Sequence, residues 1–212
     1  MLVLVVAVVG GLLAGALLGG SLANLEHLSL RFASLVVLAL LVQIVAFSPI
    51  GARLPHDAVI GLHIGSYVLL LVCVAANIRR PPVMVFGAGV LSNAVTIVVN
   101  GGYMPASRAA LRLAGLPVSA IPHNNSELAA SGDHLRFLGD VFALPHSLPL
   151  ANVFSIGDIL IAIGLAWLIA EGMRGASDQA AASVEAAPAC VRSTRSPPPS
   201  SSRRSSASAW AL

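Results

Sequence analysis

The sequence has little charge and few aromatic residues. Only 10% of its 212 residues are charged and 5% are aromatic, whereas about a quarter of the residues in an ordinary soluble domain are charged. Lysine is absent, and the net charge of +3 comes from twelve arginines set against nine acidic residues. A nucleic-acid-binding protein needs a basic face interleaved with aromatic residues, so the composition argues against nucleic acid as a partner.

Cysteine is scarce as well. Cys73 lies in an apolar run and Cys190 near the C-terminus, which excludes a disulfide framework and a cysteine metal cluster. The GxSxG, HExxH and CxxC motifs are absent. Four histidines follow no metal-ligand spacing: His56, His123, His134 and His146. We therefore expect no metal and no cofactor.

Long runs of apolar residues dominate the sequence. Hydrophobic residues make up 57% of the chain, and the mean hydropathy is +0.87. A bilayer core about 30 Å thick is crossed by about 20 apolar residues of helix. Five runs approach that length: 1–18, 32–47, 58–76, 83–99 and 156–170. The sequence thus predicts an all-α membrane bundle of five transmembrane helices within residues 1–174, with the lipid bilayer as its main partner.

The first run has an alternative interpretation as a signal peptide, because Ser21 and Ala23 are small residues suited to cleavage. It lacks a basic n-region and its apolar stretch is too long, which favours an uncleaved helix. Gly11 and Gly15 have the small-xxx-small spacing that lets membrane helices approach closely. A lipid-facing helix that tolerates glycine is the alternative for these two residues.

Arginine in short loops predicts the orientation, because such loops face the cytoplasm. With five spans, one side carries four arginines: Arg31, Arg79, Arg80 and Arg174. We expect that side to be cytoplasmic, with the N-terminus outside and the C-terminus inside. The segment 175–212 is rich in Ala, Ser, Pro and Arg, and we expect a disordered cytoplasmic tail. A solubilising tail is favoured over one whose arginines contact anionic lipid.

The fourth connection, residues 100–155, is then an extracytoplasmic loop. A structureless loop of that length is uncommon, so it should contain elements of its own. Residues 106–116 favour a helix at the membrane surface that places Arg108 and Arg112 on one face. Residues 134–142 are a second helical candidate, and the sequence thus predicts a helical loop.

Two helix ends border this loop. Asn100 is followed by Gly101 and Gly102, which suits a glycine C-cap; the alternative is that Asn100 and nearby carbonyls present oxygen to a cation. At the other end, Ser155 and Asp158 fit a capping box. Asp158 is also a carboxylate in a membrane segment, which is a candidate functional group.

The two helix ends must lie on the same side of the membrane, because one helix leaves where the next returns. Asn100, Asp140 and Asp158 are therefore expected to form a polar cluster at the outer interface. Their oxygen atoms would suit a hard cation or a polar group better than zinc or copper. His63 lies one turn into the third run from the same side and joins this candidate set, although a structural role is favoured for it.

Three ordered segments carry a resemblance: N-G-G-Y-M-P at 100–105, F-L-G-D at 137–140 and V-F-S-I-G-D at 153–158. They resemble signatures of a family of small bacterial multi-pass membrane proteins known only as a domain of unknown function. The resemblance covers residues 1–171. It implies a multi-pass protein of the bacterial plasma membrane and supplies no substrate and no catalytic residue.

Two hypotheses of function remain open. The first is a non-enzymatic envelope protein, a binding or transport-associated subunit whose outer loop folds over the helix ends. The second is a membrane-embedded enzyme that acts on a lipid-linked substrate through Asp140 or Asp158. Five spans are few for a transporter that works alone, so a second copy or a partner membrane subunit is expected.

Overall fold

The structure is a computed structural model. It describes the backbone of residues 2–118, 126–148 and 151–191, and within these ranges the side chains of residues 3–175. Its contacts divide the chain into two units, Met1–Ala176 and Ser177–Leu212. The fold described below is that of the first unit.

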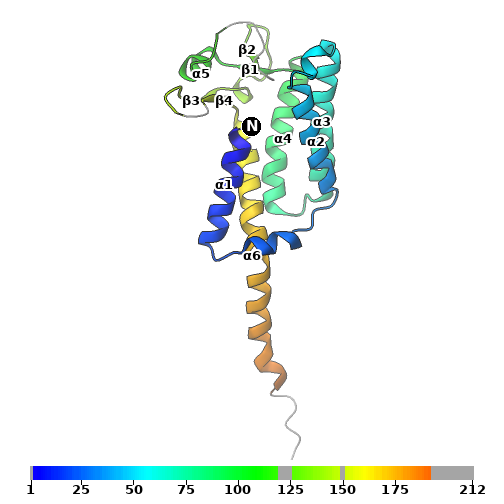
Figure 1. Ribbon diagram of the computed structural model, residues 1–212, viewed down its shortest axis with the longest axis vertical. Helices are drawn as coiled ribbons and strands as arrows, with labels where there is room; N and C mark the ends of the chain where they lie inside the picture. The colour runs from blue at the N-terminus through cyan, green and yellow to red at the C-terminus, as the bar shows by residue number, and fades with distance from the viewer. Residues whose placement is uncertain (1, 119–125, 149–150, 192–212) are drawn as a thin grey trace, which may run out of the picture. The chain divides into compact units, whose positions relative to one another are not determined.

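Apolar helices dominate this unit (Figure 1). Three of them are long and apolar enough to cross a membrane, judged by length and composition: α3 (His56–Ala76), α4 (Pro81–Val99) and residues Ile156–Gly175 of α6 (Ile156–Val191). Two others are apolar but shorter, α1 (Leu2–Leu17) and α2 (Ala33–Ala46). All five predicted apolar runs thus form helices, while five membrane spans remain a prediction.

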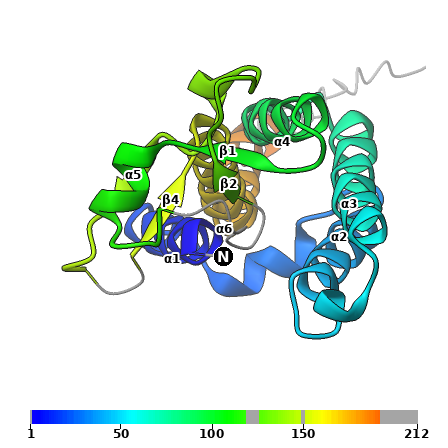
Figure 2. The ribbon, with the colours of Figure 1, turned by 90° about the horizontal axis from the view of Figure 1, so that it is seen from above.

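The helices form an open arc in the order α1, α6, α4, α3, α2 (Figures 1 and 2). Helices α1 and α6 run in the same direction, and the other neighbours in the arc run in opposite directions. Small residues set the close crossings. A Cβ atom at Gly11 would lie 2.8 Å from the carbonyl oxygen of Ala166, and one at Gly15 would overlap the side chain of Met173. The prediction that Gly11 and Gly15 serve helix packing is confirmed, since both face α6.

The connections that carry Arg31 and Arg80 meet at one end of the bundle, whereas Arg53 lies in the connection at the other end. The backbone N–H of Arg31 donates to Asn77 Oδ1 at 3.0 Å, and Asn77 Nδ2 donates back to the Arg31 carbonyl at 2.8 Å. The guanidinium of Arg80 donates to the Ser29 carbonyl at 3.1 Å. The Ser21 N–H donates to the carbonyl of Met173, near the end of the membrane-like part of α6.

The fourth connection folds at the opposite end. Strands β1 (Met104–Ala106) and β2 (Ser126–Leu128) pair in parallel, and β3 (Phe142–Leu144) and β4 (Asn152–Phe154) pair antiparallel. Helix α5 (Arg108–Leu113) packs beside them (Figure 2). The loop has its own core of Ala106, Ala110, Leu111, Ala114 and Val153.

Of the two helices predicted in this loop, one forms and the other does not. A helix in residues 106–116 is confirmed as the shorter α5, with Arg108 and Arg112 both exposed. A helix in residues 134–142 is wrong. Only the short 3-10 helix η3 (Arg136–Leu138) forms there, because Leu135 adopts a left-handed conformation with φ of 50° and Phe142 pairs with Phe154 in the β3–β4 ladder. The loop is therefore mixed and not purely helical.

Helix α6 is longer than the predicted fifth run. It continues to Val191, and residues 176–187 are rich in alanine, the strongest helix former. The predicted tail, which starts at residue 175, thus begins within this helix, and its disorder stays a prediction. The rest of the predicted tail, residues 192–212, lies outside the described part of the chain.

Candidate functional site

The end of α4 next to the folded loop closes with two glycines. Gly101 and Gly102 have φ of 74° and 105°, which glycine adopts readily. The Gly102 N–H donates to the Ile97 carbonyl at 2.8 Å and the Gly101 N–H to the Val98 carbonyl at 3.3 Å. This is the hydrogen-bond pattern of a Schellman C-cap, the geometry that a glycine cap requires.

Asn100 ties the loop to this cap. Its Nδ2 donates to the carbonyls of Thr96 at 2.7 Å and His134 at 2.9 Å, and its Oδ1 accepts from the His134 N–H at 2.8 Å. The side chain is buried. Asn100 thus holds the chain around His134 against α4, and its oxygen already accepts a protein hydrogen bond.

Ser155 and Asp158 have the geometry of a capping box at the start of α6. Ser155 Oγ accepts from the Asp158 N–H at 3.0 Å, and Asp158 Oδ2 accepts from the Ser155 N–H at 3.0 Å. The two side chains satisfy two backbone donors that the first turn of a helix leaves without partners. The negative carboxylate also lies at the positive end of the helix.

Asn93 of α4 extends the box into a closed network. Its Nδ2 donates to Asp158 Oδ1 at 2.9 Å, and its Oδ1 accepts from Ser155 Oγ at 2.9 Å. Both oxygens of Asp158 therefore accept hydrogen bonds. Asn93 and Ser155 are fully buried, and Tyr67 of α3 also interacts with Asn93. We call Asn93, Ser155 and Asp158 the interhelical network.

Glycine makes room for this network. A Cβ atom at Gly157 would overlap Asn93 Oδ1, and one at Gly89 would overlap the carbonyl oxygen of Gly157. The hydrogen bond between Asn93 and Asp158 was not predicted from the sequence. The available signal was the spacing of Gly89 and Asn93, which places both on one face of α4.

Asp140 is built into the base of the loop. Its N–H donates to the Pro105 carbonyl at 2.9 Å, and its carbonyl accepts from the Ser107 N–H at 3.0 Å. Its Oδ2 accepts from Ser126 Oγ at 2.5 Å. With 5% of its surface exposed, Asp140 thus links both strands of the β1–β2 pair.

Burial, with a smaller contribution from the charge of Asp158, raises the pKa of Asp140 to about 7, although the hydrogen bond from Ser126 acts to lower it. Among the described residues the two carboxylates have different side-chain partners: Asp140 accepts from Ser126, and Asp158 accepts from Asn93 and Ser155. Asn100 has other partners, Thr96 and His134. Convergence of Asn100, Asp140 and Asp158 stays a prediction.

The Asp140 pKa predicts a pH dependence of stability. Between about pH 4 and pH 7 the folded protein keeps a proton that the unfolded chain has released, so stability falls as pH rises through this window. We expect a loss of at least about 1 kcal/mol, since one pKa unit corresponds to 1.4 kcal/mol. Asp140→Asn keeps an acceptor for Ser126 and should remove this slope. Denaturation of both proteins in detergent at several pH values measures it, and equal slopes would refute the assignment.

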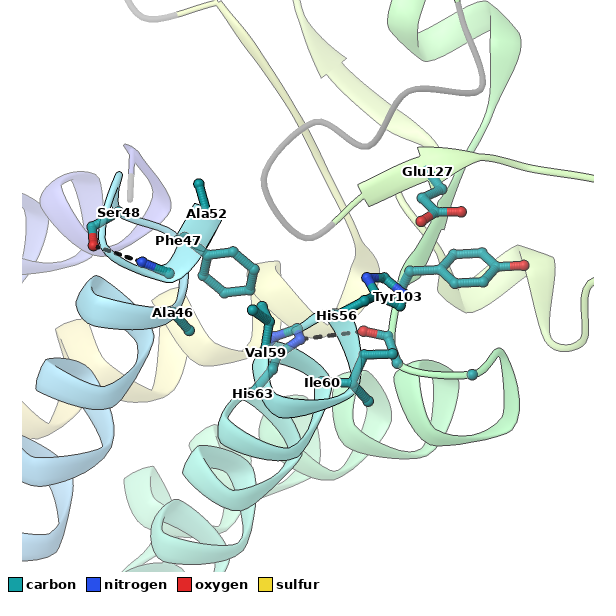
Figure 3. Close-up of a pocket in the computed structure, with 13 residues that line it drawn as sticks. Ala46, Phe47, Ser48, Ala52, His56, Val59, Ile60, His63, Tyr103 and Glu127 are labelled. Atoms are coloured by element: carbon teal, nitrogen blue, oxygen red, sulfur yellow. Dashed lines mark hydrogen bonds between the residues drawn. The ribbon is translucent and has the colours of Figure 1, made fainter. Parts of the chain in front are cut away.

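A pocket of about 450 Å³ opens beside these helix ends (Figure 3). The end of α2, the short 3-10 helix η2 (Gly51–Arg53), the first half of α3, the glycine cap and β2 all contribute to it. Its lining side chains include apolar Phe47, Val59 and Ile60 and polar His56, His63, Tyr103 and Glu127. The pocket is partly open and combines both kinds of surface.

His63 belongs to this pocket. Its Nδ1 lies 3.4 Å from the Gly102 carbonyl oxygen, and its ring packs edge-on against Phe47 with centroids 4.8 Å apart. It is 3% exposed. His63 was expected to join the polar cluster of Asn100, Asp140 and Asp158, and the pocket was not predicted. The available signal was the spacing of His56 and His63, seven residues and about two helical turns apart on α3.

Within the described ranges, no group of three or more His, Cys, Asp or Glu residues is placed to hold a metal ion. Residues 27–170 match the sequence model of a family described as a family of unknown function (DUF5317). This match agrees with the resemblance carried by the three motifs. Comparisons with curated proteins and with solved structures give no match.

Proposed function

The chain belongs to this family of unknown function, and we propose that it is a non-enzymatic, multi-pass protein of the bacterial plasma membrane that binds a small ligand or lipid head group. It serves as a binding or transport-associated subunit. The observation that carries this proposal is the pocket, which has apolar and polar walls where helix ends meet the folded loop. Ligand sites typically combine an apolar lining with a few placed polar groups.

We propose that five helices span the membrane and that the N-terminus lies outside. Helices α1 and α2 have 16 and 14 residues, about 24 and 21 Å at 1.5 Å per residue. They are short for a bilayer core, but short segments are accommodated by local thinning of the bilayer. Both pack along longer helices, α1 on α6 and α2 on α3 (Figure 2).

The arginines support this orientation. The connections that carry Arg31 and Arg80 are hydrogen bonded to each other at the end of the bundle opposite the folded loop. Short loops rich in arginine stay in the cytoplasm. The folded loop and its pocket then face the outside, at the level of the lipid head groups.

The alternative is a membrane-embedded enzyme that acts on a lipid-linked substrate through Asp140 or Asp158. The pKa of Asp140, raised to about 7 by burial, favours acid–base chemistry. Against it, Asp158 accepts hydrogen bonds on both oxygens, and neither carboxylate lines the pocket. Binding without catalysis is therefore the better proposal.

The small number of membrane spans indicates that transport would require assembly with another subunit. A pocket at the outer face gives no path across the membrane by itself, so transport would need a second copy or a partner membrane subunit. We include such a partner in the proposal.

Blocking the pocket tests the binding function. Ala52 is exposed and lines the pocket, so Ala52→Trp should fill it without disturbing the fold. The matched control is Ala109→Trp, at an exposed position on α5 that does not line the pocket. We expect native mass spectrometry from nanodiscs of mixed phospholipids to show a retained small molecule or lipid on the wild type and the control. Ala52→Trp should lose most of it, and equal retention by all three proteins would refute the proposal.

A further inference from the structure

We propose that the pocket recognises an organic cation, a primary or quaternary ammonium group. This inference rests on the proposed binding function and names the chemical class of the ligand. Three features of the pocket carry it: its formal charge, the groups around Tyr103 and the aromatic rings in its walls.

The charge of the lining residues favours a cation. Among the described residues that line the pocket, Glu127 alone carries a formal charge when histidine is neutral, and none is Lys or Arg. Arg53 follows Ala52 in η2 but does not line the pocket. A phosphate or carboxylate would therefore face Glu127 with no lining cation to offset it, whereas an ammonium group would find a counter-charge.

Carboxylates surround Tyr103, which lines the pocket. Its hydroxyl donates to Asp133 Oδ1 at 2.8 Å. This hydrogen bond, burial and the charges of Asp133 and Glu127 raise the pKa of Tyr103 to about 12. Two carboxylates thus act at this wall of the pocket. Because the Tyr103 hydroxyl already donates its hydrogen to Asp133, the residue offers a ligand its ring and the acceptor lone pairs of its oxygen, and both favour a cation over an anion.

Aromatic rings complete the arrangement. Figure 3 shows Phe47 on one side of the pocket, Tyr103 and Glu127 on the other, and the two histidines of α3 between them. Ring faces attract ammonium groups, and a nearby carboxylate adds to the attraction. An ammonium group has donors or methyl groups but no acceptor, so it suits a pocket that is lined by aromatic rings and a carboxylate.

Such a group has two sources, a free amine and the head group of a zwitterionic lipid. Free probes are choline, ethanolamine and 3,3-dimethylbutanol, a neutral isostere of choline, titrated by calorimetry into detergent-purified protein. The lipid arm compares retention of phosphatidylethanolamine and phosphatidylglycerol in nanodiscs by native mass spectrometry. The variants are Glu127→Gln and Tyr103→Leu. Glu26→Gln removes an exposed carboxylate on η1 (Leu22–His27) and is the matched control.

We expect the cationic probe to bind at least tenfold more tightly than its neutral isostere, or phosphatidylethanolamine to be retained over phosphatidylglycerol. Glu127→Gln and Tyr103→Leu should each weaken this binding several-fold, and Glu26→Gln should not. Binding of free amines identifies a free ligand, and retention of the lipid alone identifies a head group; both support the inference.

Two results would overturn the cation inference, and they have different consequences for the proposed binding function. If the neutral isostere or phosphatidylglycerol binds as well as its cationic counterpart, and Ala52→Trp blocks that binding, the cation inference fails while the binding function stands. If Ala52→Trp changes the binding of no probe, the binding function itself fails. The comparison of probes uses the wild-type protein, so it holds even if a variant does not fold.

Discussion

Gly157→Ala is expected to lower the free energy of unfolding by about 2–3 kcal/mol, the upper range for overpacking a well-packed interior. The added Cβ would overlap Asn93 Oδ1 and lie 2.9 Å from the Gly89 carbonyl oxygen, so α4 and α6 would have to move apart. That movement would also break the interhelical network. Denaturation in detergent, followed by the loss of helical circular dichroism, measures the change.

Gly61→Ala is the matched control for this substitution. Gly61 also lies in a membrane-like helix, but nothing is within 4 Å of a Cβ atom built there. Alanine has a helix propensity about 1 kcal/mol more favourable than glycine, so this variant should be as stable as the wild type or more stable. Equal destabilisation by both substitutions would contradict the close α4–α6 contact.

The second large effect is a double-mutant cycle on the interhelical network. Asn93→Asp places a second carboxylate against Asp158 and should cost about 3 kcal/mol, as for an unpaired buried charge. Asp158→Asn turns one of its two acceptors into a donor that faces the donor of Asn93 or Ser155. That variant should cost about 1–3 kcal/mol.

The exchange of both residues should restore stability. With Asp at 93 and Asn at 158, every hydrogen bond of the network can form again with donor and acceptor reversed between the two positions. The double variant should lie within about 1.5 kcal/mol of the wild type, a difference we assign to moving the charge away from the start of α6. A coupling energy near zero would show that the network does not join the two helices.

Local patterns in the sequence were sufficient for much of the fold. The apolar runs predict the helices because hydropathy is a property of consecutive residues. Both caps are predicted for the same reason, since the glycine cap lies within residues 97–102 and the capping box within residues 155–158.

Contacts between distant segments were not predictable in this way. Asn93 meets Asp158 across 65 positions, and only the glycines at the crossing hint at the pair. The strands of the fourth connection have three residues each, too few to show an alternating pattern. The pocket combines α2, α3, the glycine cap and Glu127 of β2, so no single stretch of sequence contains it.

The sidedness of the loop is the central claim, because the pocket binds an external ligand only if the loop lies outside. Ser131 is exposed in the loop, and Ser29 is exposed in the connection at the opposite end of the bundle. Each is changed to cysteine in a background where Cys73 and Cys190 are alanine, and intact cells receive a membrane-impermeant maleimide. Ser131→Cys should react in intact cells and Ser29→Cys only after permeabilisation; the reverse pattern, or equal reaction of both in intact cells, would contradict the account.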